Sequence, residues 1–117
     1  MHDHDHDQVY PVPSAELSRH RHELAPEIDD AFHAFSKAAF AEGALARKVK
    51  QLIAVAVAHT TQCPYCIRGH TLGALRDGAS EREIMEAIWV AAEMRAGGAF
   101  AHAVVALDAL ADKKRQA

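Results

Sequence analysis

Apolar residues recur at helical intervals along most of the chain. One stripe, with steps of four, three and four residues, consists of Ile28, Phe32, Phe35 and Ala39. Residues 52–58 are apolar without interruption, which predicts a helix buried on nearly all sides. No stretch alternates between apolar and polar residues for long enough to demand a β-strand. The pattern therefore indicates an all-α fold class.

Start and stop signals divide this pattern into about six helices. Ser14 is a suitable N-cap for a first, short helix that runs through Leu24. Pro26 lies at the favoured first-turn position of a second helix, and Gly43 is expected to end it. A third helix, which contains the long apolar run, is expected over residues 46–61.

The second half of the chain carries the clearest helix signals. A fourth helix, which begins after the cysteines, is expected to stop at Gly78. Ser80 followed by Glu83 has the spacing of a capping box, which predicts the start of a fifth helix. The glycine pair at 97–98 is predicted to break that helix, and a sixth is expected over residues 99–114.

The N-terminus differs from the rest in composition. Residues 1–8 contain no core-forming pattern and alternate His2, His4 and His6 with Asp3, Asp5 and Asp7. We expect residues 1–13 to form a disordered tail and lead-in, and residues 14–117 to form a single compact helical domain. Histidine-rich tracts can bind transition metals, and this one is expected to do so only weakly.

Composition and charge exclude several classes of function. Half of the 117 residues are apolar but only 6% are aromatic, so the core is thin and an oligomer is expected. The net charge of −3 provides no basic field for a nucleic acid or an anionic membrane. The longest apolar run is far too short to span a membrane, and the polar N-terminus lacks a secretory signal. We therefore expect a cytoplasmic protein, in which a cysteine pair is more often reactive than structural.

Both cysteines lie in one short stretch, residues 59–70. His59, Cys63, Cys66 and His70 have the residue types of a zinc site. On a continuous helix the outer two would be about 16 Å apart, whereas zinc ligands converge within about 2.3 Å of one centre. No bound metal is therefore expected there. Three further histidines, His20, His22 and His33, are expected at the surface.

A redox interpretation fits the same stretch better. Pro64 is best tolerated in the first turn of a helix, which makes Cys63 the N-cap and places Cys66 in that turn. Free amide groups and the helix dipole there favour thiolate over thiol. His70 lies one turn beyond Cys66 on the same face and can exchange a proton with it. The alternative is a pair of inert, buried cysteines beside a helical histidine.

The run from Lys48 to His70, with its C-P-Y-C-x-x-x-H core, resembles the alkyl hydroperoxidase D-like branch of the carboxymuconolactone decarboxylase family. The resemblance continues through residues 78–84 and 91–98 and covers roughly residues 15–112. It implies an all-helical domain that assembles into trimers or hexamers. It also implies a thiol-dependent peroxidase or disulfide reductase that uses no metal or organic cofactor.

The resemblance assigns roles to individual residues. Cys66 matches the family's peroxide-reacting cysteine, Cys63 its resolving partner, and His70 the histidine of its proton relay. That relay also uses a glutamate twelve residues before the first cysteine, and this chain has Gln51 there. Because an amide cannot accept a proton, the usual general base is missing. His59 is a candidate replacement.

Several hypotheses follow from this site. The leading one is a thiol oxidoreductase of antioxidant defence that reduces hydroperoxides or protein disulfides and is reset by an external dithiol or thioredoxin-like protein. His102, on the last helix, is a more speculative second replacement for the relay glutamate; it and His59 could equally be ordinary packed histidines. The alternatives are a redox-responsive binding module with little turnover and a carboxymuconolactone decarboxylase-type lyase, although decarboxylation needs no cysteine pair.

Overall fold

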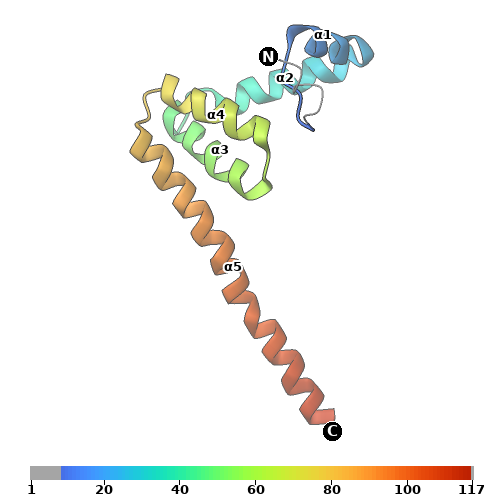
Figure 1. Cartoon of the computed structure of the whole chain (residues 1–117), viewed down its shortest axis with the longest axis vertical. Coiled ribbons are helices and arrows are strands. Elements are labelled where there is room, and N and C mark those ends of the chain that lie inside the picture. Colours follow the sequence, from blue (N-terminus) through green and yellow to red (C-terminus); the bar gives the residue numbers. More distant parts are fainter. Residues whose placement is uncertain (1–8, 117) are drawn as a thin grey trace. The chain divides into compact units, whose positions relative to one another are not determined.

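The computed structural model describes residues 9–116 and contains five helices and no strands over that range (Figure 1). The helices are α1 (Ala15–Leu24), α2 (Pro26–Phe40), α3 (Arg47–Thr61), α4 (Pro64–Arg76) and α5 (Glu81–Gln116). The all-α fold class is confirmed. Two compact units form along the chain, one up to Ala41 and one from Glu42. The predicted His/Asp-rich stretch at residues 1–8 lies outside the described residues, and the domain boundary at residue 14 stays a prediction.

The first unit is a pair of helices joined by one residue. The Ser14 hydroxyl accepts a hydrogen bond from the Leu17 N–H at 3.1 Å, so the predicted N-cap is confirmed. Ala25 ends α1 and also precedes α2, and Pro26 begins α2 as predicted. Because the connection is this short, side chains from the last turn of α1 lie close to the first turns of α2.

The prediction that Gly43 ends α2 is wrong. The helix stops at Phe40, because Ala41 leaves helical geometry for an extended conformation. Gly43 lies in the connection instead, where its N–H donates to the carbonyl of Leu45 at 3.2 Å. In the same connection, the Glu42 carboxylate accepts from the N–H of Arg47 at the start of α3.

The core of the second unit lies where α3, α4 and the start of α5 meet. Its buried residues are Val55, Ala74, Ala79 and Ile84, and Leu52 and Ile88 pack against them. The buried cluster has a small side-chain volume, because three of its four buried residues are valine or alanine. The prediction that α3 is buried on nearly all sides is wrong for this chain, since Ile53 and Val57 are about half exposed.

The turn from α4 to α5 follows its sequence signals closely. Gly78 has a φ of +96°, and the N–H groups of Gly78 and Ala79 donate to the carbonyls of Leu75 and Ala74, a Schellman ending. The capping box is also confirmed, because the Ser80 hydroxyl accepts from the Glu83 N–H and the Glu83 carboxylate accepts from the Ser80 N–H. These bonds fix the direction in which α5 leaves the core.

The predicted break at Gly97–Gly98 is wrong, because α5 is one continuous helix of 36 residues. Each glycine in a helix interior costs only about 1 kcal/mol relative to alanine, and the surrounding residues are mostly alanine, the best helix former. No proline removes a backbone donor between residues 81 and 116. Two glycines, which disfavour a helix only weakly, therefore do not end it when the sequence around them favours the helix.

Most apolar side chains of α5 are exposed in the single chain. Only Ile84 and Ala91 of this helix are buried, whereas Trp89, Phe100 and Val104 are each more than 60% exposed. Within the described range, α5 is also the one helix long and apolar enough to cross a membrane by length and composition. That criterion is weak evidence for a membrane span, because core helices of soluble proteins meet it too.

Candidate functional site

The candidate site is built on the turn between α3 and α4. Gln62, the residue after α3, has a left-handed backbone with φ 58° and ψ 51°, the one such non-glycine residue in the described range. This conformation reverses the chain, and the N–H of Cys63 donates back to the carbonyl of Ala58 at 3.1 Å. A left-handed residue other than glycine costs about 1 kcal/mol or more. The turn is therefore held in place by the helices on both sides.

Both cysteines lie at the start of α4, as predicted. Cys63 is the N-cap residue, Pro64 is in the first turn, and the Cys63 sulfur accepts a hydrogen bond from the Cys66 N–H at 3.2 Å. Cys63 and Cys66 form a disulfide, with their Cα atoms 5.2 Å apart. Both residues are partly exposed. The amide groups and dipole of a helix N-terminus stabilise a thiolate at this position once the disulfide is reduced.

His70 is linked to Gln51, which lies on a different helix. The Nδ1 of His70 on α4 is 2.9 Å from the Oε1 of Gln51 on α3. An amide oxygen only accepts hydrogen bonds, so the Nδ1 carries the proton and donates it. In this tautomer the lone pair of the neutral ring is on Nε2, the nitrogen that would take up a proton. Gln51 thus orients the ring, although it cannot itself receive a proton.

Gly73 makes room for this pair. It is buried on α4, one turn beyond His70, and a Cβ atom built on it would lie 2.8 Å from the Oε1 of Gln51. Real Cβ atoms essentially never approach another atom so closely, so any larger residue would force the glutamine to move. Sequence reasoning did not identify Gly73. The available signal was a glycine three residues after His70, on the same helical face.

The two other candidate relay histidines are held by their own helices. The Nδ1 of His59 donates to the Val55 carbonyl at 2.8 Å, and the Nδ1 of His102 donates to the Gly98 carbonyl at 2.7 Å. Each bond joins residues four positions apart, whereas the bond between His70 and Gln51 joins two helices. Of the histidines that were candidates for proton transfer, His70 is therefore the one that the structure places in an interhelical pair.

Long polar side chains tie α5 to the ends of α3. The Nη1 of Arg95 donates to the carbonyl of Thr60 at 2.7 Å, in the last turn before the cysteines. At the other end of α3, the Nζ of Lys48 lies 2.9 Å from the Oε2 of Glu83. The hydrogen bond from the Ser80 N–H, together with Lys48, lowers the pKa of Glu83 below its ordinary value of 4.5. These contacts support the helices that carry the cysteine pair.

These features define an all-helical protein with a C-x-x-C disulfide at the start of a helix. The sequence model of the carboxymuconolactone decarboxylase family matches residues 26–109. The chain belongs to the carboxymuconolactone decarboxylase family, which includes enzymes, and its resemblance to the alkyl hydroperoxidase D-like branch is consistent with this membership.

Two relatives match most of this chain. The chain is 69% identical over 83 residues to "Uncharacterized protein 4 in cox locus" of Paracoccus denitrificans, which covers 71% of this chain and 75% of that protein. It is 38% identical over 82 residues to an uncharacterized protein of Cupriavidus necator, covering 70% and 73% of the two chains. The names of these two relatives state no activity.

Solved structures show the same fold. A crystal structure of a protein from Methanobacterium thermoautotrophicum matches with a TM-score of 0.67 and 40% identity, over 71% of this chain and 93% of that one. The apo form of a carboxymuconolactone decarboxylase family protein from Legionella pneumophila matches with a TM-score of 0.62 and 37% identity. That match covers 68% of this chain and 70% of the Legionella chain.

Proposed function

We propose that the protein is a cytoplasmic thiol oxidoreductase that reduces hydroperoxides or protein disulfides through Cys63 and Cys66. The observation that carries the proposal is the partly exposed disulfide at the start of α4, with the oriented His70 ring one turn beyond it. Two cysteines separated by two residues close a very short loop, so their disulfide contributes little to folding. A reactive cysteine pair therefore explains the disulfide at the start of α4 better than a structural one does.

The proposed cycle with a hydroperoxide has three balanced steps. The Cys66 thiolate attacks the terminal peroxide oxygen, the O–O bond breaks, and the products are a Cys66 sulfenic acid and an alcohol that takes up a proton. The Cys63 thiol then loses its proton and attacks the sulfenic sulfur, the S–O bond breaks, and the hydroxide takes up that proton and leaves as water while the disulfide forms. An external dithiol protein finally supplies two electrons and two protons, which restores both thiols.

His70 moves protons in this cycle. Its Nε2 can take the Cys66 proton as the thiolate forms and return it to the departing alkoxide. A glutamate at position 51 would stabilise the positively charged ring between these events, whereas the neutral amide of Gln51 only holds it in place. We therefore infer a slower proton relay than a chain with a glutamate at that position would have.

Steady-state peroxide turnover tests the proposal. The reduced protein is mixed with a hydroperoxide and a dithiol reductant, and peroxide consumption is compared with that of a Cys66→Ser variant. Turnover by the wild type that disappears with Cys66→Ser supports the proposal. No turnover by the wild type with either small hydroperoxides or a model protein disulfide, or full turnover by Cys66→Ser, would reject it.

A second candidate function is a redox-responsive binding module, and Gln51 is the observation that favours it. A site without a full proton relay could change its surface on oxidation without turning over rapidly. The alkylation rate of Cys66 in the reduced protein separates the two functions. A rate at pH 7 no faster than that of free cysteine favours the binding module, because a catalytic thiol must be largely ionised.

We further propose that a second copy of the chain covers the exposed face of α5. Residues 96–107 contain no Asp, Glu, Lys or Arg, and Phe100 and Val104 within them are 84% and 65% exposed. A helix that is apolar on all sides is normally buried. Asp108 ends this uncharged stretch well short of the roughly 20 residues that a bilayer requires. The resemblance to the alkyl hydroperoxidase D-like branch implies a trimer or hexamer, so light scattering should give one of these masses, and a monomer would contradict the proposal.

A further inference from the structure

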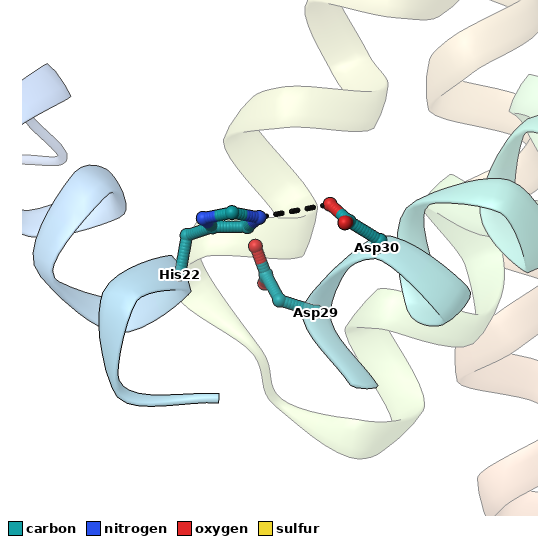
Figure 2. Close-up of side chains that lie close together, drawn as sticks. All are labelled: His22, Asp29 and Asp30. Atoms are coloured by element: carbon teal, nitrogen blue, oxygen red, sulfur yellow. Dashed lines mark hydrogen bonds and ion pairs between the residues drawn. The ribbon is translucent and has the colours of Figure 1, made fainter. Parts of the chain in front are cut away.

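A cluster of metal-ligating side chains lies where α1 meets α2, in the unit that does not contain the cysteines. His22 comes from the last turns of α1, and Asp29 and Asp30 come from the first turns of α2 (Figure 2). Ligand atoms from all three side chains lie within 4.8 Å of one another. Six residues lie between His22 and Asp29 in the sequence, and the one-residue corner at Ala25 brings the two side chains together.

The distances suit a small divalent ion. The Nε2 of His22 already lies 2.9 Å from the Oδ1 of Asp30. Zinc bound to nitrogen and carboxylate oxygen at about 2.1 Å keeps neighbouring ligands roughly 3.4 Å apart. The observed spread, from 2.9 to 4.8 Å, can therefore close around an ion through side-chain rotation. Asp30 is free to make that adjustment, because its side chain is 74% exposed.

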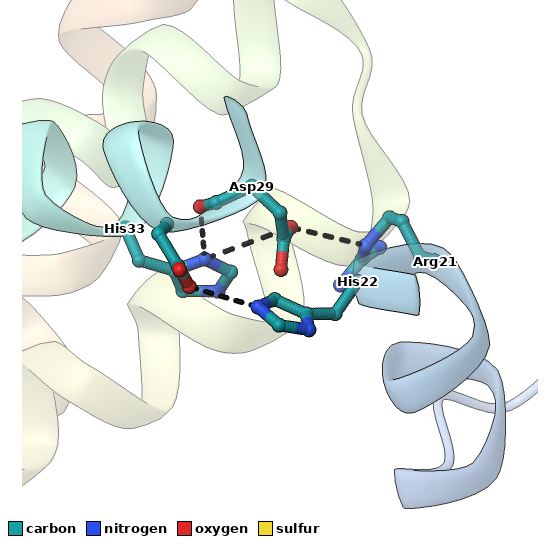
Figure 3. Close-up of polar contacts among 5 residues, drawn as sticks. Arg21, His22, Asp29 and His33 are labelled. Atoms are coloured by element: carbon teal, nitrogen blue, oxygen red, sulfur yellow. Dashed lines mark hydrogen bonds and ion pairs between the residues drawn. The ribbon is translucent and has the colours of Figure 1, made fainter. Parts of the chain in front are cut away.

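The charges in the cluster favour a cation. Asp29 has lost most of its water, since its side chain is only 14% exposed. Its ion pairs, to the Nε of Arg21 at 3.8 Å and the Nδ1 of His33 at 3.7 Å, are both longer than a hydrogen bond (Figure 3). Neither partner lies within hydrogen-bonding distance of this carboxylate. A metal ion bonded directly to Asp29 would interact with it at shorter range.

The ring of His33 has a different role. Its Nδ1 donates to the carbonyl of Asp29 at 2.7 Å, one helical turn earlier, which ties the ring to α2 beside the cluster (Figure 3). Arg21, His33 and Asp29 also line a surface hollow with Ala25, Ile28 and Phe32. Of the three cluster residues, Asp29 lines this hollow and His22 and Asp30 do not, so an ion would reach the cluster from the side of Asp29.

We propose that His22, Asp29 and Asp30 form a binding site for a divalent transition-metal ion, with zinc as the best match to one imidazole and two carboxylates. The ion would bind the Nε2 of the neutral His22 ring, whose proton then lies on Nδ1, in place of the hydrogen bond to Asp30. It would also link α1 to α2 across their one-residue connection. This site is separate from the proposed thiol chemistry, and His22 lies before residue 26, where the family match begins.

The test measures zinc binding to the full-length chain by equilibrium dialysis. All variants carry His2, His4 and His6 replaced by alanine, so that the histidine-rich tail does not contribute, and the cysteines are kept as the disulfide. We expect one zinc ion per chain in this background. Cobalt in place of zinc should give visible absorption bands that report nitrogen and oxygen ligands.

Single substitutions identify the ligands. His22→Ala and Asp30→Asn should each weaken zinc binding by at least about tenfold, because even groups that merely support a metal ligand have effects of that size. Asp30→Asn keeps the side chain's size at an exposed position, so it should not disturb folding, which circular dichroism can verify. The matched control is His20→Ala, another exposed histidine of α1 outside the cluster, and it should bind zinc as the background does.

Two results would overturn the site. Zinc binding that disappears with the tail histidines would show that the tail was the only chelator. Affinity that is unchanged by His22→Ala, or unchanged by both Asp29→Asn and Asp30→Asn, would show that these three side chains do not share an ion.

Discussion

Two histidine pairs of this protein have the same length but partners of different charge. His70 meets the amide of Gln51 between α3 and α4, and His22 meets the carboxylate of Asp30 between α1 and α2, both at 2.9 Å. An amide orients an imidazole without stabilising a positive charge, whereas a carboxylate stabilises a proton or a metal ion beside it. The comparison teaches that hydrogen-bond length alone does not reveal what a histidine does. What distinguishes the two histidines is the charge of the partner, which is neutral for His70 in the proposed proton relay and negative for His22 in the proposed cation site.

Removing the ring of His70 should have the largest effect. His70→Gln keeps a polar side chain but removes the group that exchanges protons with Cys66, so peroxide turnover should fall by about 100-fold or more. The matched control is His20→Gln, a substitution of an exposed histidine on α1, which should not change turnover. Equal rates for the two variants would mean that His70 takes no part in the reaction.

The next largest effect should come from a substitution that moves the Gln51 side chain but keeps the glutamine. Gly73→Ala places a Cβ atom where the Gln51 amide lies, so it should break the bond to His70 and lower turnover by about tenfold. The clash is with the end of a flexible side chain, which can move at low cost, so the fold should change in stability by no more than about 1 kcal/mol. Both effects can be measured on one sample, by kinetics and by denaturant unfolding.

Gly69→Ala is the control for that experiment. It lies on the same helix, but a Cβ atom there would have nothing within 4 Å. Replacing a glycine in a helix interior should then stabilise the protein by about 0.5–1 kcal/mol and leave turnover unchanged. If Gly73→Ala had the same turnover and stability as Gly69→Ala, the packing of Gln51 against Gly73 would not matter for the reaction.

The substitution Gln51→Glu gives His70 a carboxylate partner, like the one that His22 has in Asp30. The carboxylate would stabilise the protonated His70 ring, so Gln51→Glu should raise peroxide turnover by roughly threefold to tenfold. The increase should be greatest near neutral pH, where both the carboxylate and the ring can take part. A variant that is slower than the wild type would show that the amide, rather than a missing carboxylate, suits this site.

The smallest expected effect is on the pH dependence of stability. It involves the Glu83 carboxylate, whose cationic partner is Lys48. The Ser80 N–H and Lys48 lower the pKa of Glu83 below 4.5, so Glu83 stabilises the fold above that pH and loses this contribution as the pH falls through its folded-state pKa. The wild type should therefore be more stable than Glu83→Gln at pH 7, and the difference should shrink in acid, as the pH falls below 4.5. Urea unfolding at pH 7 and in acid measures it. A difference independent of pH would contradict the assigned charge interaction.

Local chemistry explains which parts of the fold were predictable. Cys63, Pro64 and Gly78 act through backbone preferences or bonds to nearby residues, and the structure has each in its expected role. The glycines at 97–98 show the limit of such signals. Their preference against helix is weak, and the alanine-rich sequence around them forms a continuous α5.

The site residues that were missed depend on contacts between helices. Gly73 became meaningful only once the structure placed Gln51 against it, 22 positions earlier in the chain. His22 was expected only at the surface and Asp29 was not singled out, because the corner at Ala25 that brings them together was not predicted. In contrast, the importance of position 51 was anticipated, because the resemblance to the family pointed to it.

The central claim is that Cys63 and Cys66 react with peroxide as a pair, and the mass of the reduced protein after one equivalent of hydroperoxide tests it most directly. The account predicts that the wild type loses a pair of hydrogen atoms as the disulfide forms, while Cys63→Ser stops at a Cys66 sulfenic acid, one oxygen atom heavier. A wild-type protein that keeps both thiols through this treatment, or that forms its disulfide equally fast without peroxide, would contradict the claim.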